Sequence, residues 1–86
     1  MTRPICCEGD FTTHGGRVIR ASGSFTIDGR RVARLGDSLS CPMHGMTKIV
    51  EGDSATLDEG IPLTLHGHLG ACGCAVICTA NATVKT

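Results

Sequence analysis

The sequence predicts an all-β fold of short hairpins with little helix. Short runs of β-branched and other apolar residues are bounded by Gly, Asp and Asn at a spacing of about ten residues, which is typical of hairpins. No long window shows the 3.6-residue hydrophobic period of an amphipathic helix. The 86 residues are 41% hydrophobic but only 2% aromatic, with 12 Gly and six Cys. A core of small side chains is marginal in so short a chain, so a metal, disulfides or a partner is expected to stabilise it.

Two segments carry the clearest strand patterns. Residues 17–35 are predicted to form strand, turn, strand, a tight turn at Asp28-Gly29, and a further strand. Asp-Gly is a favoured two-residue hairpin turn because both positions must adopt positive φ. Residues 47–65 repeat this pattern, which predicts a second meander of the same kind.

An internal repeat underlies these elements. Residues 4–14, 31–41 and 62–72 align, with Gly9, Gly36 and Gly67 at equivalent places. The next residues are Asp10, Asp37 and His68, and the windows end at His14, Cys41 and Cys72. Turn glycines alone would not place a metal-binding side chain at the same offset three times. In the third copy Asn81 stands where the first has Gly23, which predicts that a turn with positive φ is kept there.

The repeat also predicts a metal site. If the three copies surround a pseudo-threefold axis, His14, Cys41 and Cys72 converge at one end, and the Cys41-x-x-His44 pair offers a fourth ligand at zinc-binding spacing. We predict one structural Zn²⁺ held by these four side chains, with no open coordination position. His66, His68 and Cys74 lie close by in the sequence and are alternatives for one of the four.

The remaining cysteines invite a plainer interpretation. Cys6, Cys7 and Cys78 lack partners at ligand spacing and are interpreted as small buried apolar residues. In a reducing compartment, six cysteines favour metal binding or free thiols over disulfides, and a disulfide scaffold is the alternative.

Charge and composition argue against several functions. Eight Lys and Arg balance eight Asp and Glu, and the arginines are scattered, so no nucleic-acid partner is expected. The N-terminal residues contain no apolar signal region and no run of 18 apolar residues occurs, which predicts a protein that begins in the cytoplasm. Asp10 and Asp37 suit turns better than catalysis, and few aromatics are present to wall a pocket for a small-molecule substrate. We therefore expect no enzyme, and a small zinc or thiol enzyme is the less favoured alternative.

Four motifs carry a resemblance to a known family. GDFTTHGG, RRVARLGDSLSCPMHG, IVEG and LHGHLGACGC, in this order, resemble the PAAR-repeat proteins that tip type VI secretion spikes. The name motif itself is degenerate, since Arg31-Val32-Ala33-Arg34 is its nearest version. The resemblance covers essentially the whole chain. It predicts a single PAAR-like domain at residues 1–86 with three degenerate repeats, the third truncated, and no fused effector domain.

The resemblance implies both architecture and function. It predicts a cone with a zinc ion near its apex and a base that caps a trimeric valine-glycine-repeat (VgrG) spike protein, one tip per trimer. Such a tip aids membrane puncture and effector delivery, with any effector a separate protein. The protein would be cytoplasmic until firing and exported through the contractile apparatus without a signal peptide. The runner-up is the same tip on a contractile phage-like tail.

Overall fold

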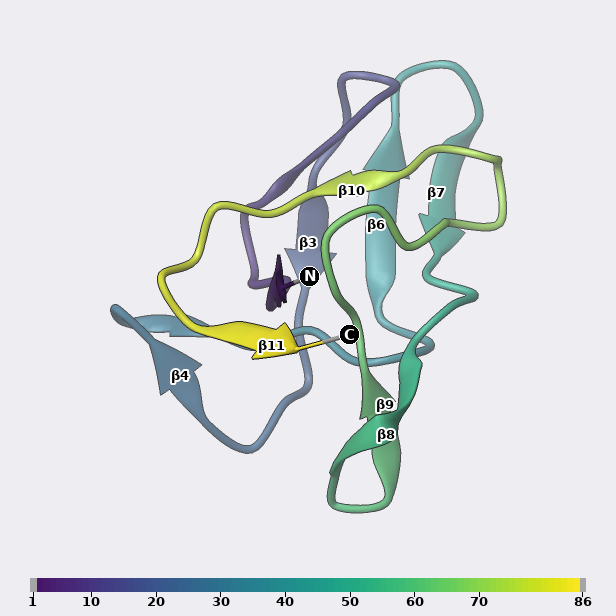
Figure 1. Cartoon of the computed structure of the whole chain (residues 1–86). Coiled ribbons are helices and arrows are strands. Elements are labelled where there is room, and N and C mark those ends of the chain that lie inside the picture. The colour runs from purple at the N-terminus through teal and green to yellow at the C-terminus, as the bar shows by residue number, and fades with distance from the viewer. Residues whose placement is uncertain (1, 86) are drawn as a thin grey trace.

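The computed structural model describes residues 2–85 and confirms the all-β prediction (Figure 1). The described residues form short strands and no helix, so no helix long and apolar enough to cross a membrane is found among them. The strands are β1 (Thr2–Pro4), β2 (Phe11–Thr12), β3 (Val18–Arg20), β4 (Thr26–Ile27), β5 (Arg30–Arg31), β6 (Ser38–Cys41), β7 (Gly45–Lys48), β8 (Asp53–Asp58), β9 (Ile61–Leu63), β10 (Val76–Ile77) and β11 (Thr83–Lys85). The molecule measures 31 × 24 × 22 Å along its principal axes.

All strand pairs are antiparallel and the sheets are small. β3, β6 and β7 form a three-stranded sheet, whereas β1–β11, β10–β2, β4–β5 and β8–β9 are two-stranded. The predicted turn at Asp28-Gly29 joins β4 to β5, with φ of 51° and 80° at its two residues. Glu59-Gly60 joins β8 to β9 in the same way, with φ of 53° and 82°. Positive φ at both central residues is the geometry that matches the twist of a tight hairpin.

The predicted meanders are only partly correct. In each segment the last two strands pair, but the first strand pairs elsewhere, because β3 and β7 both flank β6. The chain therefore leaves one sheet and enters another between β3 and β4 and again between β7 and β8. Hydrophobic alternation identifies a strand but does not identify its partner, which explains the error.

The three aligned windows form three equivalent turns, as the repeat predicts. Gly9, Gly36 and Gly67 have φ of 90°, 94° and 89°. Their amides donate hydrogen bonds to the carbonyls of Val18, Ile49 and Val76 at 2.9, 3.0 and 2.9 Å. The side chain after each glycine is buried and accepts a hydrogen bond from the amide three residues earlier, Cys7 to Asp10, Arg34 to Asp37 and Leu65 to His68, at 2.8, 2.7 and 2.9 Å. In the third turn an imidazole Nδ1 thus takes the place of a carboxylate oxygen.

The copy centred on Asp37 contains the most extensive hydrogen bonding of the three turns. Besides the Arg34 amide, the Asp37 carboxylate accepts hydrogen bonds from the Ser22 amide at 2.9 Å and from the Ser22 hydroxyl at 2.6 Å. These contacts tie the segment after β3 to the second turn.

A closed ring of backbone hydrogen bonds marks the pseudo-threefold axis. The Cys6 amide donates to Thr64, Thr64 donates to Ala33, and Ala33 donates back to Cys6, at 2.8, 3.0 and 2.8 Å. Each of the three repeats contributes one residue, so the ring joins segments that are far apart in the sequence. The small side chains at these positions allow the three backbones to approach one another.

The third unit is closed by the N-terminal strand. The Leu35 amide bonds to the Pro62 carbonyl of β9 at 2.9 Å, and the His66 amide bonds in the equivalent way to the Pro4 carbonyl of β1 at 2.9 Å. β1 therefore takes the place in the third unit that β9 takes in the second, and it pairs with β11. The return strand of the third unit is therefore β1, which comes from the other end of the sequence.

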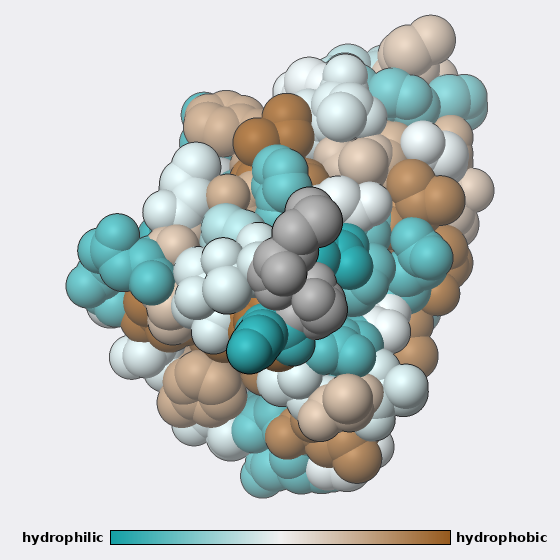
Figure 2. Space-filling view, viewed as in Figure 1, coloured by the Kyte–Doolittle hydropathy of each residue, from teal (hydrophilic) through white to brown (hydrophobic). Residues whose placement is uncertain are grey.

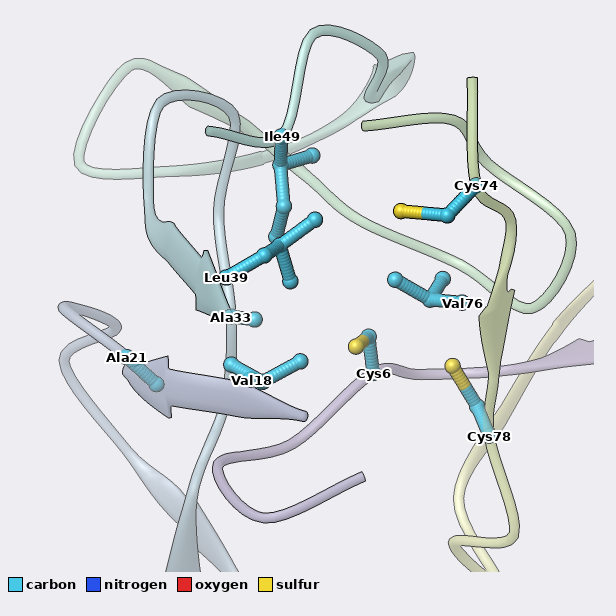
Figure 3. Close-up of a cluster of buried hydrophobic side chains, with 9 residues drawn as sticks. All are labelled: Cys6, Val18, Ala21, Ala33, Leu39, Ile49, Cys74, Val76 and Cys78. Atoms are coloured by element: carbon cyan, nitrogen blue, oxygen red, sulfur yellow. The ribbon is translucent and has the colours of Figure 1, made fainter. Parts of the chain in front are cut away.

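The core consists of small side chains, as the composition predicts. Its first cluster is drawn in Figure 3 and consists of Cys6, Val18, Ala21, Ala33, Leu39, Ile49, Cys74, Val76 and Cys78. A second cluster contains Ile5, Cys7, Val32, Leu63, Leu65 and Ala80. The prediction that Cys6, Cys7 and Cys78 are buried is confirmed.

The predicted role of Gly23 is wrong. Neither Gly23 nor Asn81 has a positive φ. A Cβ at Gly23 would instead lie 2.2 Å from a Val32 methyl carbon and 2.4 Å from the Val32 carbonyl oxygen. This glycine is required because two backbones approach closely, a contact that the local sequence does not reveal.

Candidate metal centre

Three loops are tied together at the end of the molecule that is uppermost in Figure 1. Backbone hydrogen bonds run from Thr13 to Ala75, from Ser40 to Arg17 and from Ala71 to Lys48, at 2.9, 2.8 and 2.8 Å. The donors and the acceptors occupy equivalent repeat positions. The residues that directly follow the donors are His14, Cys41 and Cys72, so the repeat brings these three side chains to one place.

All four predicted ligands meet at this end. His14, Cys41, His44 and Cys72 each offer a ligand atom, and these atoms lie within 4.8 Å of one another. The Cys41 Sγ lies 3.4 Å from the His44 Nδ1 and 3.6 Å from the His14 Nδ1, and the Cys72 Sγ lies 3.8 Å from the His14 Nδ1. His44 joins the cluster because Cys41 ends β6 and the turn to β7 returns the chain three residues later.

The distances fit a tetrahedral zinc ion. Zinc–sulfur bonds of about 2.3 Å and zinc–nitrogen bonds of about 2.0–2.1 Å at tetrahedral angles separate a sulfur from a nitrogen by about 3.6 Å. The three observed sulfur–nitrogen distances of 3.4, 3.6 and 3.8 Å lie around this value. Two cysteines with two histidines are also a common donor set of structural zinc sites.

The local electrostatics favour thiolates at both cysteines. Burial opposes ionisation of the Cys41 thiol, but hydrogen bonds from His44 and His14 outweigh it and lower the pKa. A hydrogen bond from the backbone of Cys74 lowers the pKa of Cys72. Because the thiolate is the metal ligand, both shifts favour metal binding over protonation.

The alternative ligands lie outside this cluster. The His66 Nδ1 accepts a hydrogen bond from the Cys78 amide at 3.0 Å, and the His68 Nδ1 accepts one from the Leu65 amide at 2.9 Å. Cys74 lies in the core, where burial and its contact with Cys72 raise its pKa. The geometry therefore brings together the four predicted residues and none of the three alternatives.

A second cluster escaped the sequence analysis. Cys6, Asp10 and Cys78 are all buried, and their ligand atoms also lie within 4.8 Å of one another. No short motif contains Cys6 and Cys78, which stand at opposite ends of the chain, so only the fold reveals their contact.

The opposite end of the molecule carries three two-stranded arms. They are the hairpins β4–β5 and β8–β9 and the pair β1–β11, which joins the two ends of the described chain. The strands β4, β8, β9 and β11 are labelled in the lower half of Figure 1. The outer strands β4, β8 and β11 pair with no further strand among residues 2–85. Arg34 anchors one arm, since its guanidinium lies 3.3 Å from Asp58 and 3.0 Å from Glu59.

Exposed apolar side chains do not form one large patch on the face that Figure 2 shows. Brown areas are separated there by polar residues. Two of the most exposed apolar residues, Met43 at 73% and Met46 at 64%, lie beside the metal centre, and Leu57 at 57% lies on β8.

A comparison with protein families agrees with this geometry. The family model described as PAAR motif matches residues 8–78, a stretch that contains all four clustered side chains. A search of curated proteins finds no match.

Proposed function

The chain belongs to the PAAR-motif family, and we propose that it is the structural tip of the trimeric VgrG-type spike of a type VI secretion system. The family is one of spike tips of secretion systems and phages and is structural rather than enzymatic. The observation that supports this role best is that the two ends of the molecule carry different features. A compact cluster of four side chains that could hold a metal ion lies at one end, and three two-stranded arms lie at the other.

At the end that carries the cluster, His14, Cys41, His44 and Cys72 would hold one structural Zn²⁺. Bound zinc would supply four strong bonds that join the three loops, where too few apolar side chains are available for a core. In small zinc domains such binding contributes on the order of 10 kcal/mol to folding. The thiolate-favouring environment of Cys41 and Cys72 supports this assignment.

At the opposite end, the three arms would dock on the spike. An unpaired strand edge is a template to which a strand of another protein can be added. Pairing the edges of this protein with the sheets of the spike would also protect those edges from aggregation. The outer strands β4, β8 and β11 supply one such edge from each pseudo-threefold unit. A trimer presents three equivalent surfaces, so one tip per trimer satisfies all three arms at once.

The mechanism that follows is mechanical. A rigid point concentrates force when a contractile sheath drives the spike through a target membrane, and no substrate is turned over. Under this proposal the protein waits in the cytoplasm and leaves through the apparatus itself. Effectors are carried as separate proteins on the tip or the spike.

Size-exclusion chromatography with light scattering tests the docking. The zinc-loaded protein should co-elute with the C-terminal region of a cognate VgrG-type trimer at one tip per three spike chains. Leu57→Asp at the arms should weaken this complex, whereas Met43→Asp at the metal end, a matched change at an even more exposed side chain, should not. Failure to co-elute would refute the role, and co-elution only with a phage-like tail spike would assign the tip to that machine.

A further inference from the structure

We propose that Cys6 and Cys78 form a reversible disulfide under oxidising conditions, so that the core contains a redox-dependent link between the two ends of the chain. Their sulfur atoms lie within 4.8 Å of each other in the first core cluster. Figure 3 shows the Cys78 side chain directed into the interior where Cys6 lies, beside Val76. This inference does not depend on the proposed function.

The other four cysteines have different surroundings. Cys41 and Cys72 belong to the candidate metal centre, and Cys74 contacts Cys72. The Cys7 thiol donates a hydrogen bond to the Ile5 carbonyl at 3.8 Å, the longer range that is usual for sulfur. Cys6 and Cys78 are the close pair outside the metal centre among the described residues.

A metal ion fits this second cluster poorly. It offers three donors instead of four, and both oxygens of its carboxylate are engaged. One Asp10 oxygen accepts the Cys7 amide at 2.8 Å, and the other pairs with Arg30 at 2.7 Å. The hydrogen bond between the Cys6 and Cys78 thiols, followed by burial, raises the pKa of Cys6, and the Asp10 charge acts in the same direction. Because a metal ligand must be a thiolate, the raised pKa of Cys6 disfavours metal binding at this cluster.

The fold also explains why the pair tolerates either redox state. The positions equivalent to Cys6 are Ala33 and Thr64, so the axis requires only a small side chain there. The two sulfurs already lie within 4.8 Å of each other, and rotation of the two side chains is the movement that would bring them toward the bond length of about 2.05 Å. The link would connect the axis ring to the segment just after β10.

The chemistry is thiol–disulfide exchange with a low-molecular-weight disulfide as oxidant. One cysteine loses its proton, attacks a sulfur of the oxidant and releases one small thiol, which leaves a mixed disulfide. The second cysteine then loses its proton, attacks the protein sulfur and displaces the second small thiol. Two protein thiols are oxidised to one S–S bond, and the oxidant is reduced to two thiols. Because both cysteines are buried, the exchange requires local opening and is slow in the folded protein.

The test is equilibration of the zinc-loaded full chain in glutathione redox buffers, by refolding as well as in the folded state. Free thiols are then alkylated and the cross-link is mapped by peptide mass spectrometry. The intact mass, measured before alkylation, should show a species about 2 Da lighter than the reduced protein, and the peptide map should link Cys6 to Cys78. The melting temperature should rise by about 10 °C, because the link closes a loop over most of the chain.

Two variants make the result specific. Cys6→Ala should keep the fold, since Ala33 occupies the equivalent position, and should abolish the lighter species. Cys7→Ala, the adjacent buried cysteine, should retain it. No cross-link in the wild-type protein, a cross-link mapped to another pair, or a melting temperature that falls on oxidation would each overturn the proposal.

Discussion

Replacing His14 by Ala should lower the melting temperature of the zinc-loaded protein by more than about 10 °C and change that of the metal-free protein little. His14 is central to the cluster, because its Nδ1 lies 3.6 Å from the Cys41 sulfur and 3.8 Å from the Cys72 sulfur. Structural zinc contributes about 10–16 kcal/mol through four ligands, or about 3 kcal/mol for each. For a domain of this size, 1 kcal/mol corresponds to about 4–8 °C in melting temperature, which gives the expected shift.

The assay is a thermal melt followed by circular dichroism, with saturating zinc and again with a chelator. His66→Asn is the matched control, because its side-chain carbonyl can still accept the Cys78 amide and His66 lies outside the cluster. This control should keep the full zinc-dependent increase in melting temperature, whereas His14→Ala should lose most of it.

Two results would refute this reasoning. If His14→Ala lowers the melting temperature equally with and without zinc, the side chain acts through packing and not through a metal. If His66→Asn abolishes the zinc-dependent increase, the ligand set is wrong.

Three further outcomes can be checked by equilibrium denaturation. Asp37→Ala should lower the free energy of unfolding by about 3 kcal/mol, because three hydrogen-bond donors lose their acceptor. Asp37→Asn should lower it by less. Gly36→Ala should lower the free energy of unfolding by about 1–2 kcal/mol. The cause would be backbone strain alone, because the φ of Gly36 is 94° and a Cβ there meets nothing within 4 Å. An unchanged free energy of unfolding would contradict this. Hydrogen bonds from Ser24 hold the pKa of Asp58 below its usual 3.8 in the folded protein. As the pH falls, the unfolded chain therefore binds a proton at Asp58 before the folded protein does. The contribution of the ionised Asp58 to stability is present above pH 3.8 and is lost as the pH falls further. Asp58→Asn should flatten the acid limb of the stability profile, and an unaltered limb would exclude this carboxyl as a cause.

The features that the sequence predicted correctly depend on short-range geometry. Asp28-Gly29 forms its hairpin because two adjacent positive φ values are required within a few residues. The pair Cys41 and His44 meets because one tight turn separates them. His14 and Cys72 are more distant, and they were predicted only because the repeat makes them equivalent to Cys41.

The features that the sequence did not predict depend on approach between distant segments. Gly23 is required because the backbone of Val32 approaches it too closely for a Cβ, although the sequence around Gly23 indicated a turn with positive φ. β3 and β7 pair with β6 because sheet partners are chosen by the packing of the whole chain. The contact of Cys6 with Cys78 has no signature in either local segment.

The sequence by itself thus determined the all-β class, the threefold repeat and the four clustered side chains that could hold a metal ion. These follow from local φ requirements, strand periodicity and repeat equivalence, which act over a few residues or recur at fixed offsets. Only the tertiary structure decided which strands pair, how β1 closes the third unit against β11, and which cysteines face each other in the core. Those outcomes depend on long-range burial and hydrogen bonding, which no single segment encodes.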